Sequence, residues 1–119
     1  MFSILPFEEE FYAKYDYKID YVGHPLLDTI ADRDSVSLSD FKKKNQLNEK
    51  PIIAILPGSR KQEIAKLLSL MSAITDEFPN YQFVIAGAPS QPLSFYKKFM
   101  QKELPVLQNQ TYNLLQNAY

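Results

Sequence analysis

The chain has 119 residues, of which 45% are apolar and 23% are charged, and its formal net charge is −1. This composition is that of a soluble globular chain, and the near-neutral charge excludes a global electrostatic field that would recruit nucleic acid. The absence of cysteine and the single histidine, His24, exclude disulfides, thiolate metal sites and histidine clusters. No apolar run reaches the roughly 20 residues that span a bilayer, and the acidic start is unlike a secretory signal.

The first thirty residues predict a strand, a helix and a second strand. The apolar run at residues 2–5 ends at Pro6, which suits the first turn of a helix that continues with three glutamates. Residues 17–23 alternate in polarity and end at a glycine, as a half-buried strand does. The helix carries aromatic side chains on one face, and we expect them in a core: Phe7, Phe11, Tyr12 and Tyr15.

Residues 32–50 are polar and charged and predict a connector between two structural units. Within this stretch, one short helix is expected near residues 38–45, with Ser37 or Ser39 as its cap. The lysine run Lys42–Lys44 is interpreted as a solvated face, and a membrane or anion contact is the less favoured alternative.

From Pro51 onward the pattern becomes regular. The continuous apolar run at residues 51–56 is typical of a strand that is covered on both faces. Helices and strands then alternate, which favours a parallel sheet with right-handed crossovers, half of a doubly wound α/β fold. The expected ranges are a helix at 60–78, a strand at 81–87, a helix at 92–102, a strand at 104–108 and a helix from 111. Because three strands are few for such a sheet, we expect a piece of a longer enzyme.

The Pro-Gly-Ser-Arg turn after the first of these strands is the leading candidate for a site. Ligands of open parallel sheets bind beyond the carboxyl ends of the strands, where this turn lies. Gly58 permits close backbone approach, the first N–H groups of the helix attract anions, and Arg60 adds donors for a phosphate. The same turn also fits a capping box of Ser59 and Gln62, with Glu63 favouring the helix dipole. The two roles are compatible, because different N–H groups can serve each.

His24 follows the strand at residues 17–23 and is a second candidate. A lone histidine at a tight bend is usually a structural hydrogen-bonding residue, and the residues alone favour this interpretation over a ligand contact. Asp28 is expected to cap the following turn or to accept a hydrogen bond from His24, with capping favoured. No pair of carboxylates and no Ser-His-Asp set is placed for catalysis.

Two stretches together resemble the lipid-A-disaccharide synthases. The motifs LPFE, FYxKY and VGHPLxD occur in order within residues 4–28, and LPGSRxxEI follows at residues 56–64 at the expected distance. Each motif alone is weak, whereas the ordered set is specific and covers most of the first 64 residues. Beyond residue 64 the resemblance lies mainly in the pattern of elements.

The resemblance implies an inverting glycosyltransferase with two Rossmann-like domains, the GT-B fold. The chain would be an internal fragment of it, with a partial Rossmann-like parallel sheet and flanking helices. The implied reaction moves 2,3-diacylglucosamine from UDP to 2,3-diacylglucosamine 1-phosphate in lipid A biosynthesis, with no metal and no other cofactor. The implied location is the cytoplasm of a Gram-negative bacterium, peripheral to the inner-membrane surface.

The resemblance also assigns the parts of the chain. Residues 1–31 correspond to the end of the acceptor-side domain, residues 32–50 to the passage between domains, and residues 51–119 to the first half of the UDP-sugar-binding domain. Arg60 is implied to stabilise the leaving phosphate, and the implied substrate-binding residues are Gly58, Ser59, Glu63, Gly23 and His24. The family's catalytic base and main sugar-nucleotide motif fall outside these 119 residues, so we expect the chain alone to be inactive. Its exposed strand edges predict self-association.

Two other functions remain open at this point. One is another UDP-sugar enzyme of the GT-B fold, such as the transferase of peptidoglycan lipid intermediates or a UDP-N-acetylglucosamine epimerase. Their turn motifs are richer in glycine or histidine, so LPGSR disfavours them. The other is a non-catalytic module that binds a nucleotide or anion, with a turn that only caps a helix.

Overall fold

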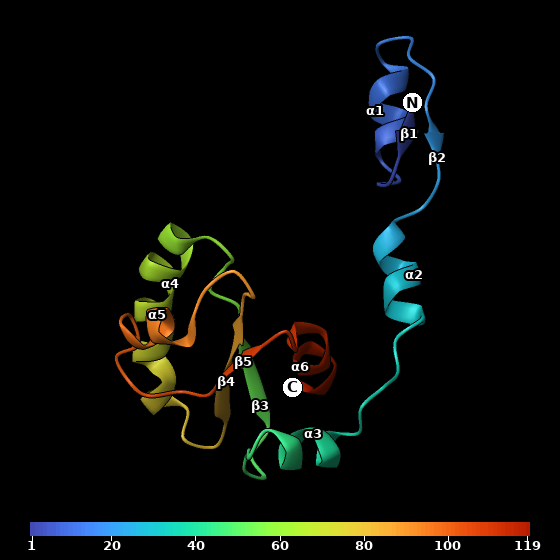
Figure 1. The fold of residues 1–119 in the computed structure, drawn as a ribbon. Helices are drawn as coiled ribbons and strands as arrows, with labels where there is room; N and C mark the ends of the chain where they lie inside the picture. Colours follow the sequence, from blue (N-terminus) through green and yellow to red (C-terminus); the bar gives the residue numbers. More distant parts are fainter. The chain divides into compact units, whose positions relative to one another are not determined.

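The computed structural model describes residues 1–119, which form two units: Met1–Asp34 and Ser35–Tyr119 (Figure 1). Both units combine helices with parallel strands. This arrangement confirms the expected α/β class, a partial Rossmann-like sheet with flanking helices. No helix has both the length and the apolar character needed to cross a membrane.

The first unit contains two short parallel strands and two helices. Strand β1 (Phe2–Ser3) pairs with β2 (Asp20–Tyr21), and helix α1 (Glu8–Ala13) connects them. Helix α2 (Pro25–Ala31) follows β2 directly. The predicted order of strand, helix and strand is confirmed, although each element is shorter than its sequence pattern.

The aromatic side chains of α1 lie at the surface of this unit, so the prediction that they form a core is wrong. No residue of α1 is buried, and the Phe7 and Tyr15 side chains are 63% and 70% exposed. Only Ser3 and Ile19 are buried among the first 34 residues. Two strands of two residues and two short helices have too little surface to enclose a core.

The second unit is built on a parallel three-stranded sheet with β4 in the centre. Strand β4 (Gln82–Gly87) pairs with β3 (Ile52–Ile55) on one side and with β5 (Val106–Gln108) on the other. In this register Ile85 lies opposite both Ile55 and Val106. All three strands predicted after Pro51 are therefore confirmed.

Helices cover both faces of this sheet. They are α3 (Leu38–Lys44), α4 (Lys61–Ala73) with the 3₁₀ turn η1 (Ile74–Glu77), α5 (Leu93–Lys97) and α6 (Thr111–Asn117). Figure 1 shows α4 and α5 on one face and α6 on the other, with α3 beside it. The expected helix at 60–78 is thus α4 continued by η1.

Two hydrophobic clusters explain why the strands are mostly apolar. One cluster lies under α4 and α5 and consists of Ile55, Ile64, Leu68, Phe83, Ile85 and Tyr96. The other lies under α3 and α6 and consists of Phe41, Ile52, Val84, Ala86 and Leu114. Successive side chains of β4 enter opposite clusters, as the two-residue period of a strand requires. A strand covered on both faces is apolar along its covered part, as β4 is from Phe83 to Gly87.

Helix α3 is an integral part of the second unit. Its Phe41 side chain is 1% exposed and lies in the cluster with Ile52 and Val84. The Asp40 N–H donates to Ser37 Oγ at 3.2 Å, which confirms Ser37 as the cap. The boundary between the two units therefore lies within the expected connector, between Asp34 and Ser35.

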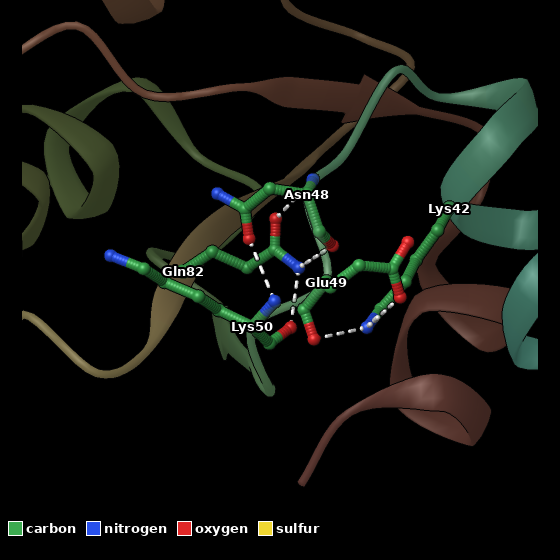
Figure 2. Close-up of polar contacts among 5 residues, drawn as sticks. All are labelled: Lys42, Asn48, Glu49, Lys50 and Gln82. Atoms are coloured by element: carbon green, nitrogen blue, oxygen red, sulfur yellow. Dashed lines mark hydrogen bonds and ion pairs between the residues drawn. The ribbon is translucent and has the colours of Figure 1, made fainter.

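Lys42 departs from the prediction of a solvated lysine face. It is buried, whereas Lys43 and Lys44 are exposed. Lys42 Nζ donates to the Glu49 carbonyl at 2.8 Å and lies 3.8 Å from the Glu49 carboxylate (Figure 2). The segment after α3 folds back over the lysine stem, because the chain must turn there to enter β3.

The Gln82 side chain holds the same segment from the other side. As Figure 2 shows, it lies between Asn48 and Lys50 at the start of the sheet. Gln82 Nε2 donates to the carbonyls of Asn48 at 2.7 Å and Lys50 at 2.6 Å, and Gln82 Oε1 accepts the Asn48 N–H at 3.1 Å. One amide thereby satisfies three backbone groups that belong to no helix or strand.

We predict that Gln82→Glu destabilises the second unit by about 2 kcal/mol, because a carboxylate cannot donate to the two carbonyls. Urea denaturation followed by circular dichroism measures this loss. Gln116→Glu on the exposed side of α6 adds the same charge without touching that segment. Equal denaturation midpoints for the two variants would contradict the prediction.

Candidate functional site

The turn between β3 and α4 lies at the carboxyl edge of the sheet, where the sequence placed the candidate site. Gly58 has φ of +105°, a left-handed conformation that favours glycine. A Cβ atom at this position would lie 2.6 Å from Glu63 Oε2 and 2.8 Å from Glu63 Cβ. The turn therefore depends on glycine twice, once for its backbone angle and once for the space that Glu63 occupies.

The cap of α4 differs from the predicted one. The expected capping box of Ser59 and Gln62 is wrong, because the helix begins one residue later, with Arg60 at the N-cap and Glu63 at N3. Glu63 Oε2 accepts the N–H groups of Ser59 and Arg60, each at 3.2 Å. The Glu63 carboxylate thus provides the half of a capping box that reaches back from the helix. The residues alone predict a dipole role for Glu63, and the family resemblance implies a substrate contact, which stays a prediction.

This cap leaves part of the helix start available to an anion. The N–H groups of Lys61 and Gln62 donate to no protein acceptor and belong to the first turn. The Arg60 guanidinium is 84% exposed and lies 3.6 Å from Glu63 Oε1. An exposed pair of this kind is worth less than about 1 kcal/mol, so the guanidinium can turn towards a ligand at small cost.

A cavity of about 370 Å³ opens beside the turn. Its lining comes from the ends of β3 and β4, the turn itself and the start of α6: Leu56, Gly58, Ser59, Ala86, Ala88, Pro89 and Thr111. Small side chains on β4 leave the space, and hydroxyls stand on the turn and on α6. The volume falls within the range of small-molecule sites.

The structure thereby joins four of the six predicted site residues. Gly58, Ser59, Arg60 and Glu63 form one turn, with the first two in the cavity wall. Sequence reasoning missed the cavity residues on β4 and α6. The sequence feature that could have indicated the cavity residues near β4 is the pair of alanines on either side of Gly87. They lie at the carboxyl end of a strand, where ligands bind in this architecture.

The other two predicted site residues lie in the first unit and form a local bend. Gly23 has φ of +83°, and His24 is the N-cap of α2. His24 Nδ1 accepts the Leu26 N–H at 3.1 Å. In the neutral ring this places the proton on Nε2, which faces away from the cap. His24, and not Asp28, therefore caps the turn, as the residues alone favour for His24. The substrate contact that the family resemblance implies for Gly23 and His24 stays a prediction.

We predict that Glu63→Ala lowers the free energy of unfolding of the second unit by about 1 kcal/mol, because two N–H groups at the start of α4 lose their acceptor. Ser59→Ala, in the same turn, changes it by less than about 0.5 kcal/mol. Urea denaturation of both variants makes the comparison. A larger loss for Ser59→Ala than for Glu63→Ala would restore Ser59 as the capping residue.

The parallel sheet with helices on both faces defines a Rossmann-like unit, and the glycine turn and the adjoining cavity lie at the edge where ligands of this architecture bind. The family model described as lipid-A-disaccharide synthetase matches residues 1–118, and the chain belongs to this family. The proteins of this family are glycosyltransferases of lipid A biosynthesis.

Similar proteins come from several bacteria. A lipid-A-disaccharide synthase of Coxiella burnetii (strain Dugway 5J108-111) is 36% identical over 124 residues, which cover 100% of this chain and 32% of the relative. Lipid-A-disaccharide synthase 2 of Legionella pneumophila (strain Lens) is 38% identical over 82% of this chain and 26% of its own length. The synthase of a Sulfurihydrogenibium species (strain YO3AOP1) is 34% identical over 99% and 35% respectively. The chain thus spans between about a quarter and about a third of the length of these relatives.

Proposed function

We propose that these residues form the part of a lipid-A-disaccharide synthase that binds the donor diphosphate. The full reaction would move 2,3-diacylglucosamine from UDP to 2,3-diacylglucosamine 1-phosphate with inversion, at the cytoplasmic surface of the inner membrane. Within it, residues 51–119 would be the first half of the UDP-sugar domain, residues 32–50 the passage between domains, and residues 1–31 the end of the acceptor-side domain.

The observation that carries this proposal is the position of Arg60. Its guanidinium is 84% exposed, and the residue stands between Ser59, which lines a cavity of about 370 Å³, and Lys61 and Gln62, whose N–H groups have no acceptor. Departure of UDP leaves negative charge on the β-phosphate, and donors fixed at that place stabilise the transition state. Arginine suits this role because it is always charged and presents a planar fork of donors.

The turn divides its donors between the protein and the ligand. Glu63 takes the N–H groups of Ser59 and Arg60, which fixes the backbone of the turn. The N–H groups of Lys61 and Gln62 then remain for phosphate oxygens, assisted by the positive end of the α4 dipole. The Ser59 hydroxyl stands in the cavity wall and would contact the nucleotide or the sugar.

We predict that UDP binds at this turn and that Arg60→Ala weakens its binding about tenfold, through loss of a charge-assisted contact. Amide chemical shifts of the labelled chain, followed by NMR during UDP titration, give the site and the Kd. The expected shifts centre on Gly58 to Glu63. Lys66→Ala removes one positive charge from the exposed surface of the same helix and serves as the matched control. Absence of shifts at millimolar UDP, or equal weakening by both variants, would overturn the proposed site.

We further propose that the chain alone does not form the disaccharide and that it self-associates through its strand edges. Strand β3 is an edge strand, because β4 is its one neighbour in the sheet. The Tyr119 N–H donates to the Ile52 carbonyl at 2.8 Å, but no other strand pairs with the outer edge of β3. Unpaired strand edges are templates for pairing with another chain.

Sedimentation velocity at increasing concentration is expected to show dimers or larger species. A clean monomer at high concentration would contradict the proposal of self-association. Disaccharide formation by the purified chain would contradict the proposal of inactivity.

A further inference from the structure

The loop after β4 forms one wall of the cavity beside the candidate turn. It runs from Ala88 to Pro92, and its residues Ala88 and Pro89 line the cavity together with Gly58 and Ser59. Loop walls need fixed backbone positions if they are to contact a ligand without a large ordering cost. What fixes this loop therefore bears on the affinity of the site.

Tyr96 on α5 reaches the first residue of this loop. Its ring is fully buried in the cluster with Ile64, Leu68 and Ile85. Its Oη atom accepts the Ala88 N–H at 2.7 Å. The side chain thus has two separable parts: an aromatic ring that packs in the core and a hydroxyl that holds the cavity wall.

A second tether holds the far end of the loop. Gln108 Nε2, on β5, donates to the Gln91 carbonyl at 2.5 Å. Between the tethers, the Gln91 N–H donates to the Ala88 carbonyl at 3.2 Å and closes the loop on itself. The wall is therefore fixed by a helix at one end and by the neighbouring strand at the other.

We propose that Tyr96 is a positioning residue for the nucleotide site: its hydroxyl holds Ala88 and thereby keeps the cavity wall in its ligand-binding position. This inference rests on the proposed function, since the ligand is the UDP moiety proposed for the turn. Tyr96 acts through Ala88 and touches no ligand, because its side chain has no exposed surface.

The test is Tyr96→Phe, which keeps the ring in the core and removes only the acceptor of the Ala88 N–H. We expect about five- to tenfold weaker UDP binding and faster amide hydrogen exchange at Ala88. Tyr81→Phe is the matched control: Tyr81 lies just before β4, at the opposite end of the strand, and its hydroxyl makes no hydrogen bond. NMR titration of the folded variants with UDP gives the Kd separately from any loss of stability.

The outcomes separate the two proposals. If the wild-type chain does not bind UDP, the proposed phosphate site is overturned and this inference falls with it. If the wild-type chain binds and Tyr96→Phe binds equally well, the positioning role alone is overturned, even where the variant is less stable. Should Tyr96→Phe fail to fold, amide hydrogen exchange at Ala88 in the wild-type chain, with and without UDP, reports on the bond to Tyr96 directly. Slower exchange with UDP bound is expected, and unchanged exchange at saturating UDP would overturn the inference.

Discussion

The second unit depends on the complete burial of its central strand. From Phe83 to Gly87 every residue of β4 is buried, and the strand pairs with a neighbour along both edges. Its side chains supply both hydrophobic clusters, so neither pair of helices can pack without it. The two ends of the strand have different roles. At the start, the Gln82 side chain holds the segment that enters the sheet, and at the other end Ala86 and the following Ala88 line the cavity. A single apolar strand thus links the stability of the unit to the shape of its candidate site.

Much of this second unit could be predicted, because its periodicity has a simple physical cause. Continuous apolar runs mark strands that are covered on both faces, and β3 and β4 follow that rule. A serine cap of α3 was predictable because a serine before a helix accepts its first N–H groups, and of the two expected candidates the structure selects Ser37 over Ser39. The turn at Gly58 could be placed at the carboxyl edge of the sheet, and it is a candidate site because ligands of parallel sheets bind at that edge.

Other features could not be predicted, because they depend on where the chain turns in space. Two capping patterns overlap in the turn, Ser59 with Gln62 and Arg60 with Glu63, and only the left-handed backbone at Gly58 decides between them. The aromatic face of α1 has the pattern of a core helix, yet the first unit offers it no partner surface. In the sequence, the alanines at the end of β4 look like ordinary core residues. They border a cavity because the turn with Gly58 and Ser59 lies next to them in space.

The placement of Glu63 creates an electrostatic condition for the proposed ligand. The Glu63 carboxylate already accepts the N–H groups of Ser59 and Arg60 just before α4, so a diphosphate bound at this turn would approach a negative charge. Repulsion between the two would oppose binding in the absence of a nearby cation. Arg60, 3.6 Å from that carboxylate, lies where it can offset both charges at once. The same arrangement explains why a structural cap and an anion site can share one turn.

The burial of Lys42 makes three consecutive lysines chemically unequal. Lys43 and Lys44 present their amines to solvent, whereas the amine of Lys42 is covered and bonded to the Glu49 carbonyl. An acylating reagent or a lysine-modifying enzyme would reach the first two in the folded chain and the third only after the segment around Glu49 moves away from its amine. In a single peptide map, the ratio of label at these neighbouring positions would therefore record how often that segment opens.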